Sequence, residues 1–175
     1  MFSGVMFLTL ALAGAPQAPA TAQVDSARGS YELVKGYLLK AAAQVPEEHF
    51  VFQPTPDVRT LGALFGHVAD ANFMICSAAS GEKPTMAGIE KSKKSKADLE
   101  AALAASFKFC DAAFDSLKGA RADETVKFFL PGAHTRLGVM AFNTAHDFEH
   151  YGNIVTYMRI KGLVPPSSAP RGGAE

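Results

Sequence analysis

Apolar residues recur at helical spacing in four segments of the chain, and the alternation typical of β-strands is nearly absent. The predicted helices span about residues 24–43, 60–80, 95–117 and 136–161. The third has one apolar stripe, formed by Leu99, Leu103, Phe107, Cys110, Phe114 and Leu117. Four amphipathic helices without strands predict an all-α four-helix bundle.

Helix ends and connections support these boundaries. Thr60 and Ser95 are suitable N-caps, and Gly162 is a suitable C-terminal stop before two prolines. The connection 81–94 is longer than an ordinary helix hairpin needs, so we expect it to cross over the bundle. The irregular stretch 118–135 contains Phe128 and Phe129, which we expect to fold back on the core.

The N-terminal segment has the character of a targeting sequence. Residues 1–15 are almost wholly apolar but too short for a comfortable membrane span. The small-x-small pattern of residues 20–22 fits signal-peptidase cleavage. No Lys or Arg precedes Arg28, so an uncleaved anchor stays the alternative. We predict a signal peptide over 1–22, one domain over 23–168 and a disordered tail over 169–175.

Composition narrows the class of protein. Hydrophobic residues make up 48% of the chain and charged residues 19%, which allows a sizeable core. The formal net charge of zero argues against a nucleic-acid partner, which requires a basic excess. Cys76 and Cys110 lack the spacing of a zinc motif. A disulfide between them is possible in an oxidising compartment, but we favour two free core cysteines.

Three histidines form the candidate chemical site. His146 and His150 are four residues apart, so both imidazoles project from one face of the last helix. His67 lies in an apolar run of the second helix, where a histidine is unexpected. Taken separately, the pair on the last helix could arise by chance, and His67 could be a core histidine bonded to a backbone carbonyl. Together they predict a site for one divalent ion, most favourably Zn²⁺ or Ni²⁺, with one position open.

Several neighbours complete the predicted pocket. Asp70 follows His67 by nearly one turn and is expected to orient a ligand, unless it is a surface carboxylate. Asn153 and Tyr157 lie beyond His150 and would orient whatever occupies the gap beside the ion. The alternative is that Met74 and Tyr157 fill the gap, which would leave a closed structural ion. Asp147 and Glu149 are expected only to flank the histidines.

Two patches of sequence resemble the DinB-like (damage-inducible) superfamily. One is the segment 146–166, HDFEHYGNIVTYMRIKGLVPP. The other comprises residues 52–56, FQPTP, and residues 61–69, LGALFGHVA. The resemblance implies a crossover four-helix bundle, commonly dimeric, with a divalent ion bound by His67, His146 and His150. Where that family usually has Gln, this chain has the shorter Asn153.

Two functions remain open from the sequence. The first is an exported, periplasmic or secreted, metal-dependent enzyme, either a hydrolase or a thiol transferase, the latter implied by some DinB-like relatives. The second is a non-catalytic bundle that binds a metal or a small ligand. No nucleophile set and no phosphate-binding glycine loop is evident, and the substrate is not predicted.

Overall fold

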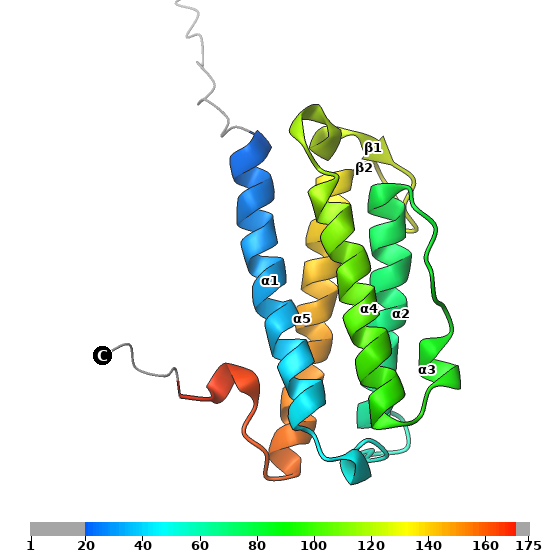
Figure 1. The fold of residues 1–175 in the computed structure, drawn as a ribbon, viewed down its shortest axis with the longest axis vertical. Coiled ribbons are helices and arrows are strands. Elements are labelled where there is room, and N and C mark those ends of the chain that lie inside the picture. Colours follow the sequence, from blue (N-terminus) through cyan, green and yellow to red (C-terminus); the bar gives the residue numbers. More distant parts are fainter. Residues whose placement is uncertain (1–19, 171–175) are drawn as a thin grey trace, which may run out of the picture.

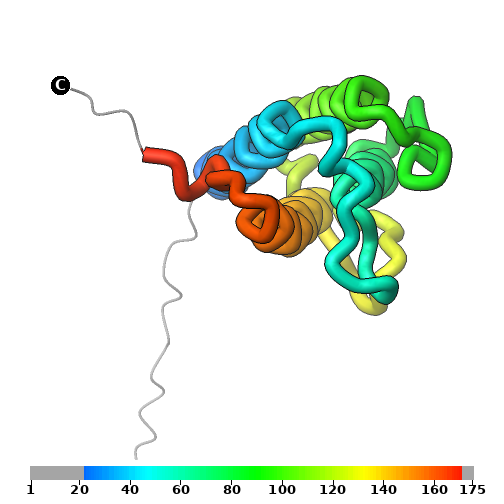
Figure 2. Tube along the Cα trace, turned by 90° about the horizontal axis from the view of Figure 1, so that it is seen from below, coloured from blue at the N-terminus to red at the C-terminus, as the bar shows by residue number. Residues whose placement is uncertain are grey.

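The computed structural model describes residues 20–170 and has four long helices. They are α1 (Ala20–Gln44), α2 (Leu61–Ser80), α4 (Lys96–Asp115) and α5 (Arg136–Ile160). Figures 1 and 2 show them packed side by side. The shorter elements are η1 (Glu47–His49), α3 (Ile89–Ser92), η2 (Gly119–Asp123), β1 (Thr125–Val126), β2 (His134–Thr135) and η3 (Pro166–Ser168). The predicted all-α bundle is confirmed.

The connection between α2 and α4 runs back along the bundle, so the two helices are parallel (Figure 1). The contacts between α2 and α4 have a constant register. Asn72 hydrogen-bonds Ser106 and Cys76 is bonded to Cys110, and the two residues of each pair are 34 positions apart in the sequence. Helix α5 is antiparallel to α2, and Tyr157 near its end reaches Arg59 just before α2 begins. The crossing connection carries α3, which packs against α2.

Local capping explains where the helices begin and end. The hydroxyls of Thr60, Ser95 and Thr135 each accept a hydrogen bond from a backbone N–H in the first turn of α2, α4 and α5. Gly81 ends α2 with a φ of 83°, a conformation that other residues rarely adopt. The boundaries predicted for α2 agree with the structure, while α1 begins earlier than predicted.

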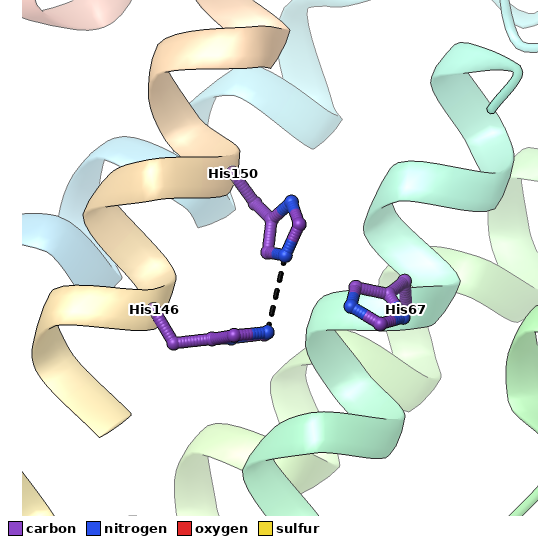
Figure 3. A group of neighbouring side chains, drawn as sticks. All are labelled: His67, His146 and His150. Atoms are coloured by element: carbon purple, nitrogen blue, oxygen red, sulfur yellow. Dashed lines mark hydrogen bonds between the residues drawn. The ribbon is translucent and has the colours of Figure 1, made fainter. Parts of the chain in front are cut away.

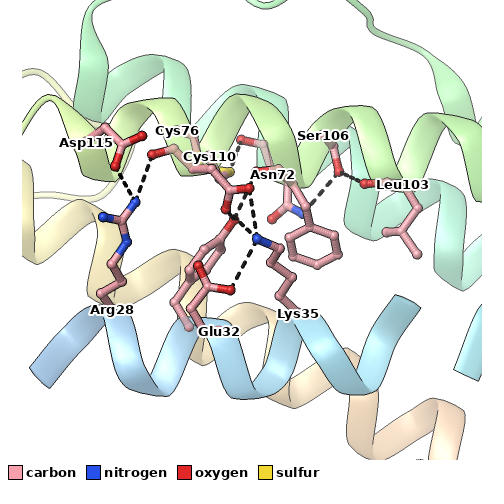
Figure 4. A network of polar contacts seen from close by, with 12 residues as sticks. Arg28, Glu32, Lys35, Asn72, Cys76, Leu103, Ser106, Cys110 and Asp115 are labelled. Atoms are coloured by element: carbon pink, nitrogen blue, oxygen red, sulfur yellow. Dashed lines mark hydrogen bonds and ion pairs between the residues drawn. A yellow bond between two sulfur atoms is a disulfide. The ribbon is translucent and has the colours of Figure 1, made fainter. Parts of the chain in front are cut away.

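The core consists of the apolar stripes that the sequence predicts. Tyr31, Val34 and Leu38 of α1 are fully buried, as are Leu103 and Cys110 of α4. Arg28 of α1 forms an ion pair with Asp115 of α4 across the outer edge (Figure 4). Helix α2 alone among the described residues is long and apolar enough to cross a membrane, and 67% of that window is buried within the bundle.

Two predictions about local structure are wrong. Residues 118–135 include a short antiparallel ladder, β1–β2, although we expected no strands. Cys76 and Cys110 form a disulfide with a Cα–Cα distance of 5.3 Å, although we favoured free cysteines. The parallel register of α2 and α4 brings the two cysteines together, and the sequence contains no direct sign of that register.

The predicted N-terminal and C-terminal segments fall largely outside the described residues. Residues 1–19 and 171–175 are not described, and residues 20–22 lie in the first turn of α1. The signal peptide and the disordered tail therefore stay predictions. Near the end of the described chain, the Ser167 backbone N–H donates to the Tyr151 hydroxyl at 2.9 Å, which holds η3 against α5.

Candidate metal centre

Helices α2 and α5 bring His67, His146 and His150 together (Figure 3). One potential ligand atom from each residue lies within 4.8 Å of those of the other two. The Nε2 atoms of His146 and His150 are 3.1 Å apart. The His67 ring centroid lies 4.6 Å from that of His150 and 5.3 Å from that of His146. Among residues 20–170, these three histidines are the group placed to hold a metal ion.

The orientation of His67 is set by Glu90, a residue that the sequence pattern did not indicate. His67 Nδ1 donates to Glu90 Oε2 at 3.1 Å, because an ionised carboxylate can only accept. Arg59 Nε donates to the other carboxylate oxygen at 2.9 Å. Burial opposes ionisation, but Arg59 and the bond to His67 lower the pKa of Glu90 below its usual value. With Nδ1 protonated, His67 Nε2 is the free ligand atom.

Asp70 holds the segment that carries Glu90. Its two carboxylate oxygens accept the backbone N–H groups of Ile89 and Glu90, each at 2.9 Å. A Cβ at Gly66 would lie 2.8 Å from the Glu90 Cα, so this approach requires glycine. Asp70 therefore acts on the site through α3, and its carboxylate is directed at the α3 backbone.

Both histidines of α5 are neutral at pH 7. Burial, followed by the neighbouring His150 and His67, lowers the pKa of His146 to about 4. Burial, followed by His67 and Arg59, lowers the pKa of His150 to about 4. Their Nδ1 atoms are buried and have no hydrogen-bond partner among the described residues. Neutral imidazoles with unused nitrogens are the form in which histidine binds metals.

Two cavities border the histidines at different levels of the α2–α5 groove. One, of about 530 Å³, is lined by Arg59, Glu90, His150, Asn153 and Tyr157, among others. The other, of about 390 Å³, is lined by His67, Ala71, Met74, Phe142 and His146, among others. The predicted Asn153 and Tyr157 thus lie at the first cavity. The Tyr157 hydroxyl donates to the Arg59 carbonyl at 3.0 Å. Met74 is 52% exposed and lines the second cavity.

A second polar cluster lies in the core and joins α2 and α5 to α4. This core polar cluster consists of Asn72, Ser106, Asn143 and Asp147, all fully buried. Asn143 Nδ2 donates to Asn72 Oδ1 at 2.9 Å and to Asp147 Oδ2 at 3.2 Å. Burial raises the pKa of Asp147 well above its usual value. We expected Asp147 to flank the histidines, but it points into the core.

Comparison with known proteins agrees with this architecture. A profile of the DinB superfamily matches residues 30–154. A DinB-like protein of Bacillus subtilis superposes with a TM-score of 0.64 at 16% identity, over 85% of this chain and 99% of that chain. A conserved protein of Enterococcus faecalis superposes with a TM-score of 0.57 at 17% identity, over 81% of this chain and 94% of that chain.

No curated protein matches the chain. The two solved structures are less than 25% identical to it and therefore support the fold alone. The family profile covers more than half of the chain, including all three histidines. The sequence resemblance is confirmed, and this protein belongs to the DinB superfamily.

Proposed function

We propose that this protein is a metal-dependent hydrolase that binds one divalent ion through His67, His146 and His150. The observation that carries the proposal is the meeting of three imidazole nitrogens within 4.8 Å between two cavities. Such a donor set, with no fourth member of the group among the described residues, is typical of catalytic rather than structural zinc sites.

The geometry fits an ion of this kind. Nitrogens bound to one zinc ion at about 2.0–2.1 Å lie roughly 3.4 Å apart in a tetrahedral site. The His146–His150 pair, at 3.1 Å, is close to that spacing, and a small ring movement brings His67 into range. Imidazole donors favour Zn²⁺ or Ni²⁺, whereas Mg²⁺ and Ca²⁺ favour oxygen ligands.

The side chains around the histidines have separate tasks in this proposal. A divalent ion held by three imidazoles polarises water and carbonyl groups near neutral pH. Glu90 keeps the His67 proton on Nδ1, and Arg59 keeps Glu90 ionised and in place. Asp70 fixes α3, so that this chain of contacts keeps its geometry when a substrate enters.

The disulfide favours hydrolysis over thiol transfer. Disulfides persist mainly in oxidising compartments, where the low-molecular-weight thiols of the cytosol are not maintained. We therefore also propose that the protein is exported, to the periplasm or to the outside. We propose further that it forms a homodimer and has no nucleic-acid partner, in line with its family resemblance and zero net charge.

One observation favours the second candidate, a non-catalytic metal-binding bundle. Two carboxylates that line the cavities are already engaged, since Glu90 is bound to Arg59 and Asp70 to the α3 backbone, and Asp57 at the first cavity is exposed to water. Asp147 is buried away from the site. In a hydrolase, the base would be Asp57 at the first cavity, Glu90 released from one of its two partners, or a group of the substrate itself.

Metal analysis and turnover together test the proposal. The protein purified from its native host should contain about one equivalent of zinc or nickel. The metal-loaded protein should hydrolyse members of an ester and amide panel, and dialysis against a chelator should abolish this. The variant His146→Ala/His150→Ala should lack both properties. Stoichiometric metal without any turnover would favour the binding bundle, and thiol-dependent turnover would favour the transferase.

A further inference from the structure

The groove between α2 and α5 has different chemistry on the two sides of the histidines. The side toward the end of α5 is the cavity with Arg59, Glu90 and Asn153, here named the polar chamber. The side toward the start of α5 is the cavity with Ala71, Met74, Ile75, Phe129 and Phe142, here named the apolar chamber. His150 lines the first, while His67 and His146 line the second.

The apolar chamber presents large hydrophobic side chains that are open to water. Met74 is 52% and Phe129 is 60% exposed, although apolar surface gains by leaving water. Phe142 is held in place by edge contacts with Phe128 and Phe129. Asp70 also lines this chamber, but both its oxygens are engaged by the α3 backbone. The chamber therefore suits an uncharged apolar group.

The polar chamber offers groups that suit a hydrogen-bonding partner. Arg59 and Glu90 form an ion pair at its wall, at 2.9 Å, and both side chains are partly exposed. Asn153 adds an exposed carboxamide one turn beyond His150. Since both signs of charge and an amide are present, a neutral or zwitterionic polar group fits better than one of high net charge.

We infer that the substrate is amphipathic, with a compact aromatic or branched aliphatic acyl group linked through an ester or amide to a polar group. The acyl group would occupy the apolar chamber, the polar group the polar chamber, and the carbonyl would lie at the histidines between them. This inference rests on the proposed hydrolase. Water oxygen bonds to the carbonyl carbon, the C–O or C–N bond breaks, and the leaving atom keeps the electron pair and gains a proton.

Hydroxamates test this preference without turnover, because they bind metal ions and resist hydrolysis. Calorimetry on the zinc-loaded full chain would compare acetohydroxamate with 3-phenylpropanohydroxamate. Burial of the phenyl group should make the second bind about 10- to 100-fold more tightly. Ala71→Phe should remove most of this difference by filling the apolar chamber. The same change at Ala104, an exposed residue of α4, should leave it intact.

Phe129→Ala provides a second variant if Ala71→Phe fails to fold, since Phe129 is exposed and is not one of the buried core residues. It should reduce the preference by about 3- to 10-fold. Equal affinities for the two hydroxamates would overturn the substrate class while leaving the metal site intact. A protein that binds no zinc would instead overturn the proposed function. In that case, NMR shifts caused by 3-phenylpropanol in wild type but not in Ala71→Phe would still support the chamber, and identical spectra would refute it.

Discussion

Helices α2 and α5 each contribute to two polar clusters with opposite character, the histidine site and the core polar cluster. In the core polar cluster, the Asn143 amide donates to an amide and a carboxyl oxygen, and the Asn72 amide donates to the Ser106 hydroxyl. In the histidine site, the Nε2 atoms of His146 and His150 share a single hydrogen bond, and their Nδ1 atoms have no partner among the described residues. The first cluster is joined by amide hydrogen bonds, although Asn143 Oδ1 and Asp147 Oδ1 have no partner among the described residues, whereas the second is a group of imidazole nitrogens that could hold a cation.

This difference follows from the rotation of about 100° that separates neighbouring residues on an α-helix, such as His146 and Asp147. His146 and His150 occupy one face of α5, while Asn143 and Asp147 share another, again four residues apart. One face borders the two cavities, and the other lies in the core, where Asn143 bonds Asn72 of α2. We therefore expect substitutions at the two clusters to affect different properties. Those at the histidines should change metal binding, and those in the core polar cluster should change stability.

The largest expected effect is on metal binding in His146→Ala/His150→Ala. Loss of two of three ligands should lower the affinity for Zn²⁺ by several orders of magnitude. The fold should survive, because the apolar core does not include these side chains. Competition with a chelating dye measures the affinity, and circular dichroism measures the fold. His134→Ala, which changes a histidine of β2 outside the site, is the control and should bind metal normally.

The second largest expected effect is a loss of stability in the variant Asn143→Ala. The change removes the donor to both Asn72 Oδ1 and Asp147 Oδ2 and leaves two buried acceptors unpaired. The free energy of unfolding should fall by about 2–4 kcal/mol. Urea denaturation measures it, and the folded fraction should keep its zinc affinity.

Asn153→Ala is the matched control for this prediction, because it removes an exposed asparagine from the same helix. It should change the free energy of unfolding by less than about 0.5 kcal/mol. Equal losses in both variants would mean that the core polar cluster contributes nothing specific. A loss of zinc affinity in folded Asn143→Ala would mean that the two clusters are coupled.

The sequence predicted those parts of the protein that depend on local chemistry. Helix spans follow from apolar periodicity, and Thr60 and Ser95 cap where expected because capping involves only the next turn. His146 and His150 were found because a four-residue spacing fixes their relative position before any tertiary contact forms. His67 was found because a histidine in an apolar run is unusual.

The missed features depend on contacts between distant segments. Glu90 lies in an irregular connection without periodicity, and only Asp70 and the missing Cβ of Gly66 bring it to His67. The Cys76–Cys110 disulfide depends on the parallel register of α2 and α4. The burial of Asp147 depends on how α5 is rotated against its neighbours, which a single helix does not reveal.

A smaller effect is expected at Glu90, which touches the site only through His67. In Glu90→Gln, one of the two accepting oxygens becomes an NH2 donor, so either Arg59 Nε or His67 Nδ1 faces another donor. His67 is then free to move its proton to Nε2, the atom needed as ligand. The zinc affinity should fall about 10- to 100-fold. Glu124→Gln, which weakens a distant ion pair with Arg136, should leave the affinity unchanged.

The smallest effect is a pH dependence of the metal-free protein. Burial and neighbouring charges lower the pKa of His146 and that of His150 from the ordinary histidine value of 6.5 to about 4. Below pH 6.5 the unfolded chain therefore binds protons that the folded protein does not, and stability falls as the pH falls toward 4. The two rings interact, so we expect a combined loss of roughly 1–3 kcal/mol rather than the sum of two full shifts.

Urea denaturation of the metal-free protein at pH 6.5 and pH 4 measures this loss. Other groups also titrate over this range, so the informative quantity is the difference between wild type and His146→Ala/His150→Ala. The variant should lose about 1–3 kcal/mol less than wild type, because it lacks the two imidazoles. Parallel losses would mean that both rings take up protons as readily in the folded protein as in the unfolded chain. The neutral, acceptor-rich histidine site would then be ruled out, and the contrast with the core polar cluster would disappear.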